Sequence, residues 1–208
     1  MSPTASATRL PSDPPRPQLP RARDRLHAYL DAGDEAIERR LGRVRNSPTL
    51  DTAAIVTSNL ADYGAVWLVV GAVKAARDRS SRQRVVTALA VAGVSSTLVN
   101  WTAKQLVGRS RPEGPEPTSA RGVRRPTSSS FPSGHTLAAW CTAVVLADSP
   151  AEMAAYLAFA GATAFSRVHL RAHHATDVVG GATLGLAVGV IARGLTRRRR
   201  RSSRPTIS

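Results

Sequence analysis

The chain has 208 residues, of which 29 are basic and 14 acidic, so its formal net charge is +15. That charge suggests nucleic-acid binding, but aromatic residues make up only 4% of the chain, which is few for a base-stacking surface. A single cysteine excludes an intrachain disulfide framework and a cysteine-based zinc site.

The N-terminal part divides into a tail and a helix. Residues 1–20 hold six prolines and few apolar side chains, which predicts a disordered tail. No apolar run lies near Met1, so no cleavable signal peptide is expected. Residues 21–46 carry apolar side chains at helical spacing and predict an amphipathic helix. Such a helix lies either at a membrane surface or against the rest of the domain.

The remaining basic residues cluster between apolar segments that carry little charge. Five segments, within a core predicted for residues 47–195, are expected to be helices: about 53–76, 85–104, 135–147, 151–167 and 176–194. Apolar tracts flanked by basic loops are typical of membrane segments, although short Ala/Gly-rich tracts also occur as buried helices of soluble bundles. With no strand alternation, the pattern predicts an all-α, membrane-embedded helical bundle of about five transmembrane helices.

Two further features complete the pass along the chain. A loop rich in Pro, Ser and Arg, residues 105–131, separates the second helix from the third. The last segment carries Gly181, Gly185 and Gly189 on one stripe, which permits close helix packing. Residues 196–208 form a basic tail.

Polar residues gather at the ends of these apolar segments. Lys104, Arg111 and Arg167 are three cations that can hold a multiply charged oxyanion, the arginines with forked donors that match phosphate. Ser133 and Gly134 lie at the predicted N-terminus of the third helix, where free backbone N–H groups and the helix dipole favour an anion. Taken singly, each feature is also explained as an interfacial anchor or a capped turn.

Two histidines and a carboxylate can supply the chemistry. His173 and Asp177 are four residues apart, so on a helix they share a face, and the carboxylate can orient the imidazole as a nucleophile. His135 is a second histidine, suited to protonating a leaving oxygen. With the cations, these residues predict phosphoryl transfer through a phosphohistidine. Asp177 is the only acid near them in the sequence, so we expect no metal site and no cofactor.

These clusters resemble the signature of the type-2 phosphatidic acid phosphatase superfamily, K-x6-R-P, P-S-G-H and S-R-x5-H-x3-D. The matching stretches are KQLVGRSRP from Lys104, PSGH from Pro132 and SRVHLRAHHATD from Ser166. The resemblance covers about residues 50–195. Two positions stand out: His169, where relatives often carry an aromatic residue, and His174, which fails the spacing that His173 satisfies.

The resemblance implies that helix ends meet at one site with no required metal. It assigns His173 as nucleophile, Asp177 as its orienting group and His135 as the acid. Lys104, Arg111, Ser133, Gly134 and Arg167 would hold the phosphate. Members hydrolyse phosphatidate, prenyl pyrophosphates, phosphatidylglycerophosphate and related lipid phosphates. The expected partners are therefore a lipid phosphate and membrane lipids, not nucleic acid.

Charge also predicts topology. The Arg-rich tail is expected in the cytoplasm, which places the catalytic helix ends outside, at the plasma membrane. Residues 1–45 then fall outside despite their net positive charge, unless the chain crosses a sixth time, as many members do. A vanadate-dependent haloperoxidase-like enzyme and a non-enzymatic basic membrane protein are the alternatives. No residue pattern in the 113–131 loop names the head group of the substrate.

Overall fold

The computed structural model describes residues 22–45, 47–113 and 128–202, and the regular structure in these residues is entirely helical. The helices are α1 (Ala22–Leu41), α2 (Pro48–Ala61), α3 (Ala65–Arg77), α4 (Arg82–Val94), α5 (Asn100–Val107), α6 (Gly134–Leu146), α7 (Pro150–His169) and α8 (Ala175–Ser202). The predicted all-α fold is confirmed. The predicted tail at 1–20, the middle of the 105–131 loop and the last residues of the basic tail lie outside the described residues.

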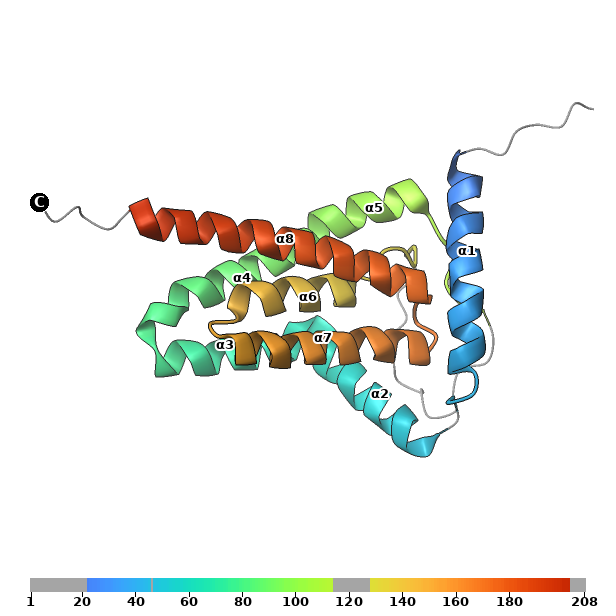
Figure 1. Ribbon diagram of the computed structural model, residues 1–208, viewed down its shortest axis with the longest axis horizontal. Helices are drawn as coiled ribbons and strands as arrows, with labels where there is room; N and C mark the ends of the chain where they lie inside the picture. Colours follow the sequence, from blue (N-terminus) through green and yellow to red (C-terminus); the bar gives the residue numbers. More distant parts are fainter. Residues whose placement is uncertain (1–21, 46, 114–127, 203–208) are drawn as a thin grey trace, which may run out of the picture.

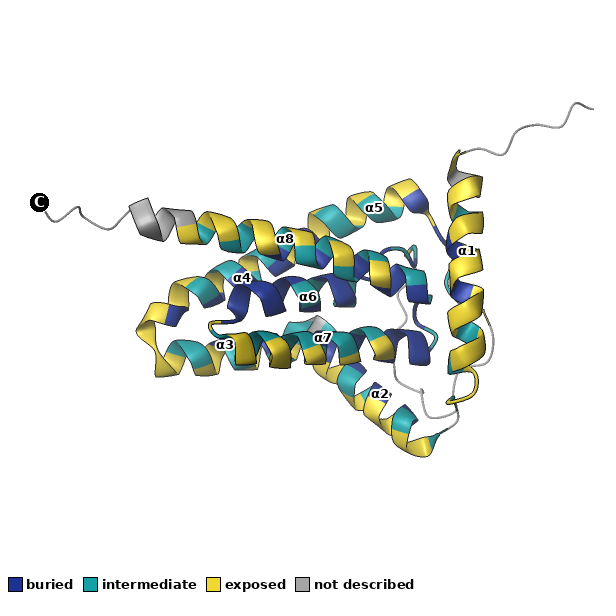
Figure 2. Cartoon of the chain, viewed as in Figure 1, coloured by how far each residue is buried: buried dark blue, intermediate teal, exposed yellow. Residues whose placement is uncertain are grey.

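Helix α6 is the centre of the bundle, with α4, α7 and α8 packed around it (Figure 1). Its side chains are buried along nearly its whole length, in contrast to the half-exposed helices around it (Figure 2). The glycine stripe of α8 packs directly on α6. A Cβ atom at Gly181 would lie 2.5 Å from the Ser133 carbonyl oxygen, and one at Gly185 would lie 2.5 Å from that of Leu137. Only glycine permits this backbone approach.

Two helical stretches are long and apolar enough to cross a membrane by themselves. They are Arg79–Val107, which includes α4, a π-helical stretch at Ser95–Val99 and α5, and Ala175–Arg197 in α8. Helices α2 and α3 pass the same test only together, with a 60° bend between them. Helices therefore occupy all five predicted positions, but length and composition give two or three independent crossings among the described residues.

The predicted continuous helix over 53–76 is wrong. The chain breaks at a 3₁₀ turn, Asp62–Gly64, where Gly64 has a φ of +69°. This left-handed conformation is easy for glycine and costly for other residues. The break places Asp62 where it can face into the bundle.

Helix α1 lies across the end of the bundle where α5 ends and α8 begins (Figure 1). Leu30 and Asp34 are buried against the bundle, whereas Tyr29 is 80% exposed. Asp34 accepts hydrogen bonds from the backbone N–H and the hydroxyl of Thr176, both at 2.7 Å. Helix α1 therefore packs on the domain, and this contact ties it to the first turn of α8.

Candidate active site

A cavity of about 540 Å³ opens at this end of the bundle. Its polar end is lined by Lys104, Arg111, Gly134, His135 and His173. Its walls continue between α3 and α4 and are mainly apolar, with Trp67, Leu68, Leu89, Ala92 and Ala138 among the lining residues. Five of the eight residues predicted from the sequence therefore share one cavity, and an amphiphilic ligand fits its division into polar and apolar parts.

Two cations reach the cavity from the end of α5 and the loop after it. Lys104 lies in the last turn of α5, and its Nζ donates to the Ser128 hydroxyl at 3.0 Å. The helix stops at Gly108, which has a φ of +60° and donates its N–H to the Lys104 carbonyl, a common glycine C-cap. The chain then turns back, so that Arg111 lies against the α7–α8 connection.

Arg111 and His173 are in direct contact. Nη1 of Arg111 donates to the Ala172 carbonyl at 2.5 Å and lies 3.4 Å from Nε2 of His173. A guanidinium next to this nitrogen can hold an anionic group against it. The cavity side of His173 is therefore its Nε2 atom.

The other ring nitrogen of His173 is held from behind. Nδ1 lies 2.8 Å from the Ser130 carbonyl oxygen and 3.6 Å from Oδ2 of Asp177. The nearest acceptor is thus a backbone carbonyl that the sequence analysis did not identify. The carbonyl selects the tautomer with the proton on Nδ1 and a lone pair on Nε2. Burial lowers the pKa of His173 to about 4, because the loss of solvation outweighs the nearby Asp177 carboxylate.

The predicted shared helix face is wrong in detail, because His173 lies before α8 begins at Ala175. Helix α7 ends at His169, and Arg171 follows with a φ of +53°. The backbone N–H of His173 then donates to the Arg167 carbonyl at 3.1 Å. This tight turn brings His173 beside the first turn of α8. His173 and Asp177 therefore lie close together, although they are not on the same helix.

A buried arginine missed by the sequence analysis holds Asp177. Nη1 of Arg109 lies 3.0 Å from Oδ1 of Asp177, and its Nη2 lies 2.6 Å from Asp34 and 2.5 Å from Asp31. The side chains of Arg109, Asp34 and Asp177 are nearly or fully buried, so these two ion pairs are largely desolvated, whereas Asp31 is exposed. The sequence does offer one hint of this role. Arg109 lies inside the first motif, between Lys104 and Arg111, and is therefore close to the predicted site.

His135 also has a carboxylate partner that was not predicted. Its Nε2 lies 2.8 Å from Oδ1 of Asp62, which is located at the break between α2 and α3. The expectation that Asp177 is the only acid near the site is therefore wrong, because folding brings Asp62 and Asp34 to it. An acidic residue inside an apolar segment was the signal for Asp62, since such residues are often functional.

Three predicted residues lie behind the cavity wall rather than in it. Ser133 and Asp177 are fully buried, and the Ser133 backbone N–H donates to the Asp177 carbonyl at 3.0 Å. Arg167 is also fully buried and donates from Nη1 to the Ser58 hydroxyl at 2.6 Å. Gly134 does line the cavity, and a Cβ there would lie 2.8 Å from Nδ2 of Asn100. Its lack of a side chain keeps the start of α6 close to α5.

The two additional histidines have separate surroundings. His169 is fully buried, with Nε2 2.7 Å from Oδ1 of Asp51, and its ring stacks on Phe165. This pair joins α7 to α2. His174 lies near Asp177, whose Oδ2 accepts the His174 backbone N–H at 2.8 Å, but it does not line the cavity. Among the described residues, no three His, Cys, Asp or Glu side chains are grouped so as to hold a metal ion.

Known proteins share features of the sequence and of the fold of this chain. The sequence model of the PAP2 superfamily matches residues 84–201. The crystal structure of a transmembrane PAP2 type phosphatidylglycerolphosphate phosphatase from Bacillus subtilis is similar, with a TM-score of 0.66 and 25% identity over 82% of this chain and 87% of that chain. The structure of Aquifex aeolicus LpxE has the same fold, with a TM-score of 0.58 and 22% identity over 76% of this chain and 93% of that chain. No curated protein sequence matches significantly.

Proposed function

This chain belongs to the PAP2 superfamily, and on that premise we propose that it is an integral-membrane phosphatase that hydrolyses a lipid phosphate or a prenyl (pyro)phosphate. The observation that carries the proposal is the environment of His173. Its Nδ1 is held by a backbone carbonyl, and its Nε2 points to a cavity with two cations at one end. The similarity to the Bacillus subtilis phosphatase supports a lipid substrate.

In the proposed reaction, Nε2 of His173 attacks phosphorus while Lys104 and Arg111 balance the charge on the phosphoryl oxygens. The bond from phosphorus to the leaving oxygen breaks, and His135 gives that oxygen a proton. Burial disfavours the charged form of His135, and the Asp62 carboxylate, 2.8 Å from Nε2, opposes this effect and helps His135 to carry the proton that it donates. Water then attacks phosphorus, the P–N bond breaks, His135 takes the water proton, and free phosphate leaves.

The residues behind the wall have supporting roles in this scheme. Asp177 lies 3.6 Å from Nδ1 of His173 and balances the positive charge that develops when Nε2 bonds to phosphorus. In this proposal Arg167 and Ser133 keep their predicted roles in holding the phosphate, and Arg167 adds a positive charge close to His135 and His173. The apolar cavity wall suits an acyl or prenyl chain. We place the cavity at the outer face of the plasma membrane and the C-terminal tail in the cytoplasm.

The test is phosphate release from a panel of substrates by the purified chain in detergent. The panel contains phosphatidate, phosphatidylglycerophosphate, undecaprenyl pyrophosphate, a decaprenyl phosphosugar and a soluble sugar phosphate. At least one lipid substrate should be cleaved, and His173→Ala should lose at least about a thousandfold in kcat. His174→Ala is the matched control and should stay within about tenfold of the wild type. Equal activity of the His173 variant, or cleavage of the sugar phosphate alone, would contradict the proposal.

A further inference from the structure

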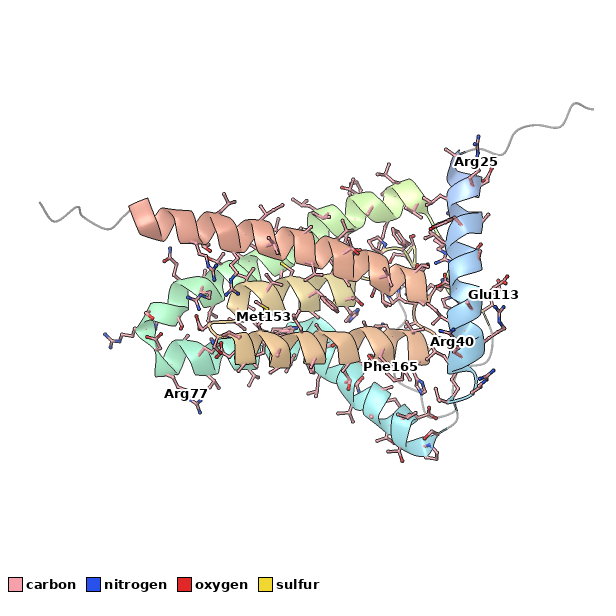
Figure 3. The ribbon with its side chains drawn as sticks, in the orientation of Figure 1. Arg25, Arg40, Arg77, Glu113, Met153 and Phe165 are labelled. Atoms are coloured by element: carbon pink, nitrogen blue, oxygen red, sulfur yellow. The ribbon has the colours of Figure 1, made fainter. Side chains whose placement is uncertain are left out.

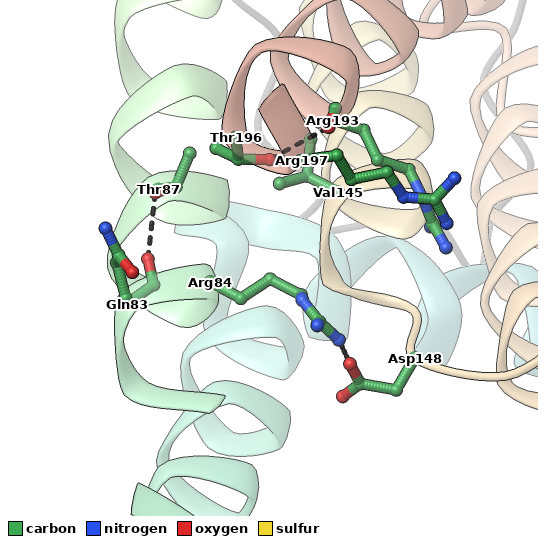
Figure 4. Close-up of a pocket in the computed structure, with 8 residues that line it drawn as sticks. All are labelled: Gln83, Arg84, Thr87, Val145, Asp148, Arg193, Thr196 and Arg197. Carbon is green, nitrogen blue, oxygen red and sulfur yellow. Dashed lines mark hydrogen bonds and ion pairs between the residues drawn. The ribbon is translucent and has the colours of Figure 1, made fainter. Parts of the chain in front are cut away.

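A second, basic cavity lies at the opposite end of the bundle from the proposed active site. It is located between the start of α4, the end of α6 and the last turns of α8 (Figure 4). It has a volume of about 80 Å³ and is lined by Gln83, Arg84, Thr87, Val145, Asp148, Arg193, Thr196 and Arg197. None of these residues belongs to the proposed reaction.

The charges around this cavity do not cancel. Asp148 lies in contact with Arg84 and 2.8 Å from Lys74, and Lys74 also contacts Glu152 at 2.6 Å. Two cations and two carboxylates therefore balance each other. Arg193 donates to the Val144 carbonyl at 2.5 Å, and in the described part of the chain neither it nor Arg197 lies within ion-pair distance of a carboxylate. Two positive charges remain for an external anion.

An apolar groove continues from the basic cavity. The groove has a volume of about 280 Å³. It shares three lining residues with the basic cavity, Gln83, Thr87 and Thr196, and its other lining residues are Val91, Ala192 and Leu195. The outer faces of the same two helices are apolar and exposed, including Val86 at 66% and Ile191 at 63%. A ligand with an anionic head and an apolar chain would match both parts.

The depth of the cavity fits a membrane interface. Arg84 and Lys104 are twenty residues apart on the Arg79–Val107 stretch, which corresponds to about 30 Å at 1.5 Å per residue. That is about the thickness of the hydrocarbon core of a bilayer. With Lys104 at one interface, Arg84 and its neighbours lie at the other.

We propose that this cavity and groove bind an anionic phospholipid of the leaflet opposite the active site. Arg193 and Arg197 would hold its phosphate, and one acyl chain would lie in the groove between α4 and α8. Basic pockets between membrane helices recognise lipid head groups in this way. We do not expect the ligand to be turned over, because none of the residues that line the cavity is a histidine. The inference does not depend on the proposed phosphatase activity.

The test is the thermal unfolding of the full chain in zwitterionic detergent with added lipid. Dioleoyl phosphatidylglycerol should raise Tm by about 4 °C or more, because a ligand that binds the folded state stabilises it. Dioleoyl phosphatidylcholine, deacylated glycerophosphoglycerol and inorganic phosphate should give no comparable rise. An equal rise with phosphatidylcholine would overturn the proposal, as would a full rise with phosphate or the deacylated head group alone.

Variants locate the effect. Arg193→Gln/Arg197→Gln should abolish the rise, and Arg197→Glu, whose wild-type side chain is exposed, should abolish it without disturbing a buried contact. The matched control is Arg77→Gln/Arg79→Gln, which also removes two positive charges from the end of the bundle that holds the basic cavity. Figure 3 shows Arg77 at this end, where α3 stops. This variant should keep the full rise in Tm. Lys104→Gln should also keep it. A rise that persists in the Arg197 variants, or disappears in Lys104→Gln, would overturn the proposal.

Discussion

Asp177 is contacted by donors from two separate parts of the chain. Arg109 comes from the loop after α5, and the backbone N–H of His174 comes from the connection after α7. Through Arg109 the carboxylate is also linked to Asp34 on α1. The charge next to the proposed nucleophile is therefore held in place partly by a helix outside the signature motifs.

Replacement of Arg109 tests this dependence. Arg109→Met leaves Asp34 and Asp177 buried without their shared cation, and loss of one member of a buried ion pair typically costs about 3–5 kcal/mol. We expect kcat to fall by about tenfold or more with little change in KM, since Arg109 does not line the cavity. Arg109→Lys should recover part of kcat. The measurement is steady-state kinetics together with Tm, and an unchanged kcat in a destabilised Arg109→Met would limit Arg109 to a structural role.

The protonation state of His173 is a second consequence of burial. Its lowered pKa, about 4, keeps Nε2 unprotonated from neutral pH down to mildly acidic pH. In ¹⁵N NMR of histidine-labelled protein, with the signal assigned by His173→Gln, the His173 resonances should not titrate between pH 8 and pH 5. A titration midpoint near 6.5, the ordinary value for histidine, would show that the ring is solvated. It would contradict the expectation that burial keeps His173 neutral.

At the scale of elements, the site depends on how closely α8 approaches α6. A Cβ at Gly185 would lie 2.5 Å from a carbonyl oxygen of α6, whereas one at Gly194 on the same helix would meet nothing within 4 Å. Gly185→Ala should therefore lower Tm, with a cost of about 1–3 kcal/mol, because backbone atoms cannot move aside as a flexible side chain can. Gly194→Ala, the matched control, should leave Tm unchanged or raise it slightly. Equal Tm values for the two variants would contradict the close packing.

The elements also show what sequence patterns can and cannot predict. Apolar tracts gave the positions of the helices, and motif spacing selected His173 over His174 because both are local features. The break at Asp62 depends on a glycine in the left-handed conformation and on a partner, His135, more than seventy residues away. The sequence around Arg109 does not distinguish it from other basic loop residues, because the carboxylates with which it pairs come from α1 and α8. Contacts between distant segments are not encoded in local spacing.

At the scale of the whole molecule, cations line a cavity at each of two ends of the described bundle. At one end the cations Lys104 and Arg111 line a cavity with two histidines. At the other end Arg193 and Arg197 line a smaller one, followed by the arginine-rich tail. These two clusters of cations match the two phosphate-bearing ligands that we propose.

The central claim is that phosphate is transferred to Nε2 of His173 without a metal ion. The most direct measurement uses His135→Ala in EDTA with a ³²P-labelled aryl phosphate, whose leaving group needs no protonation, followed by rapid quenching and peptide mapping. Without His135 to activate water, the intermediate should accumulate as an acid-labile, base-stable label on the peptide that contains His173, and His173→Ala/His135→Ala should carry none. Label on a different residue, or turnover that requires added magnesium, would contradict the account.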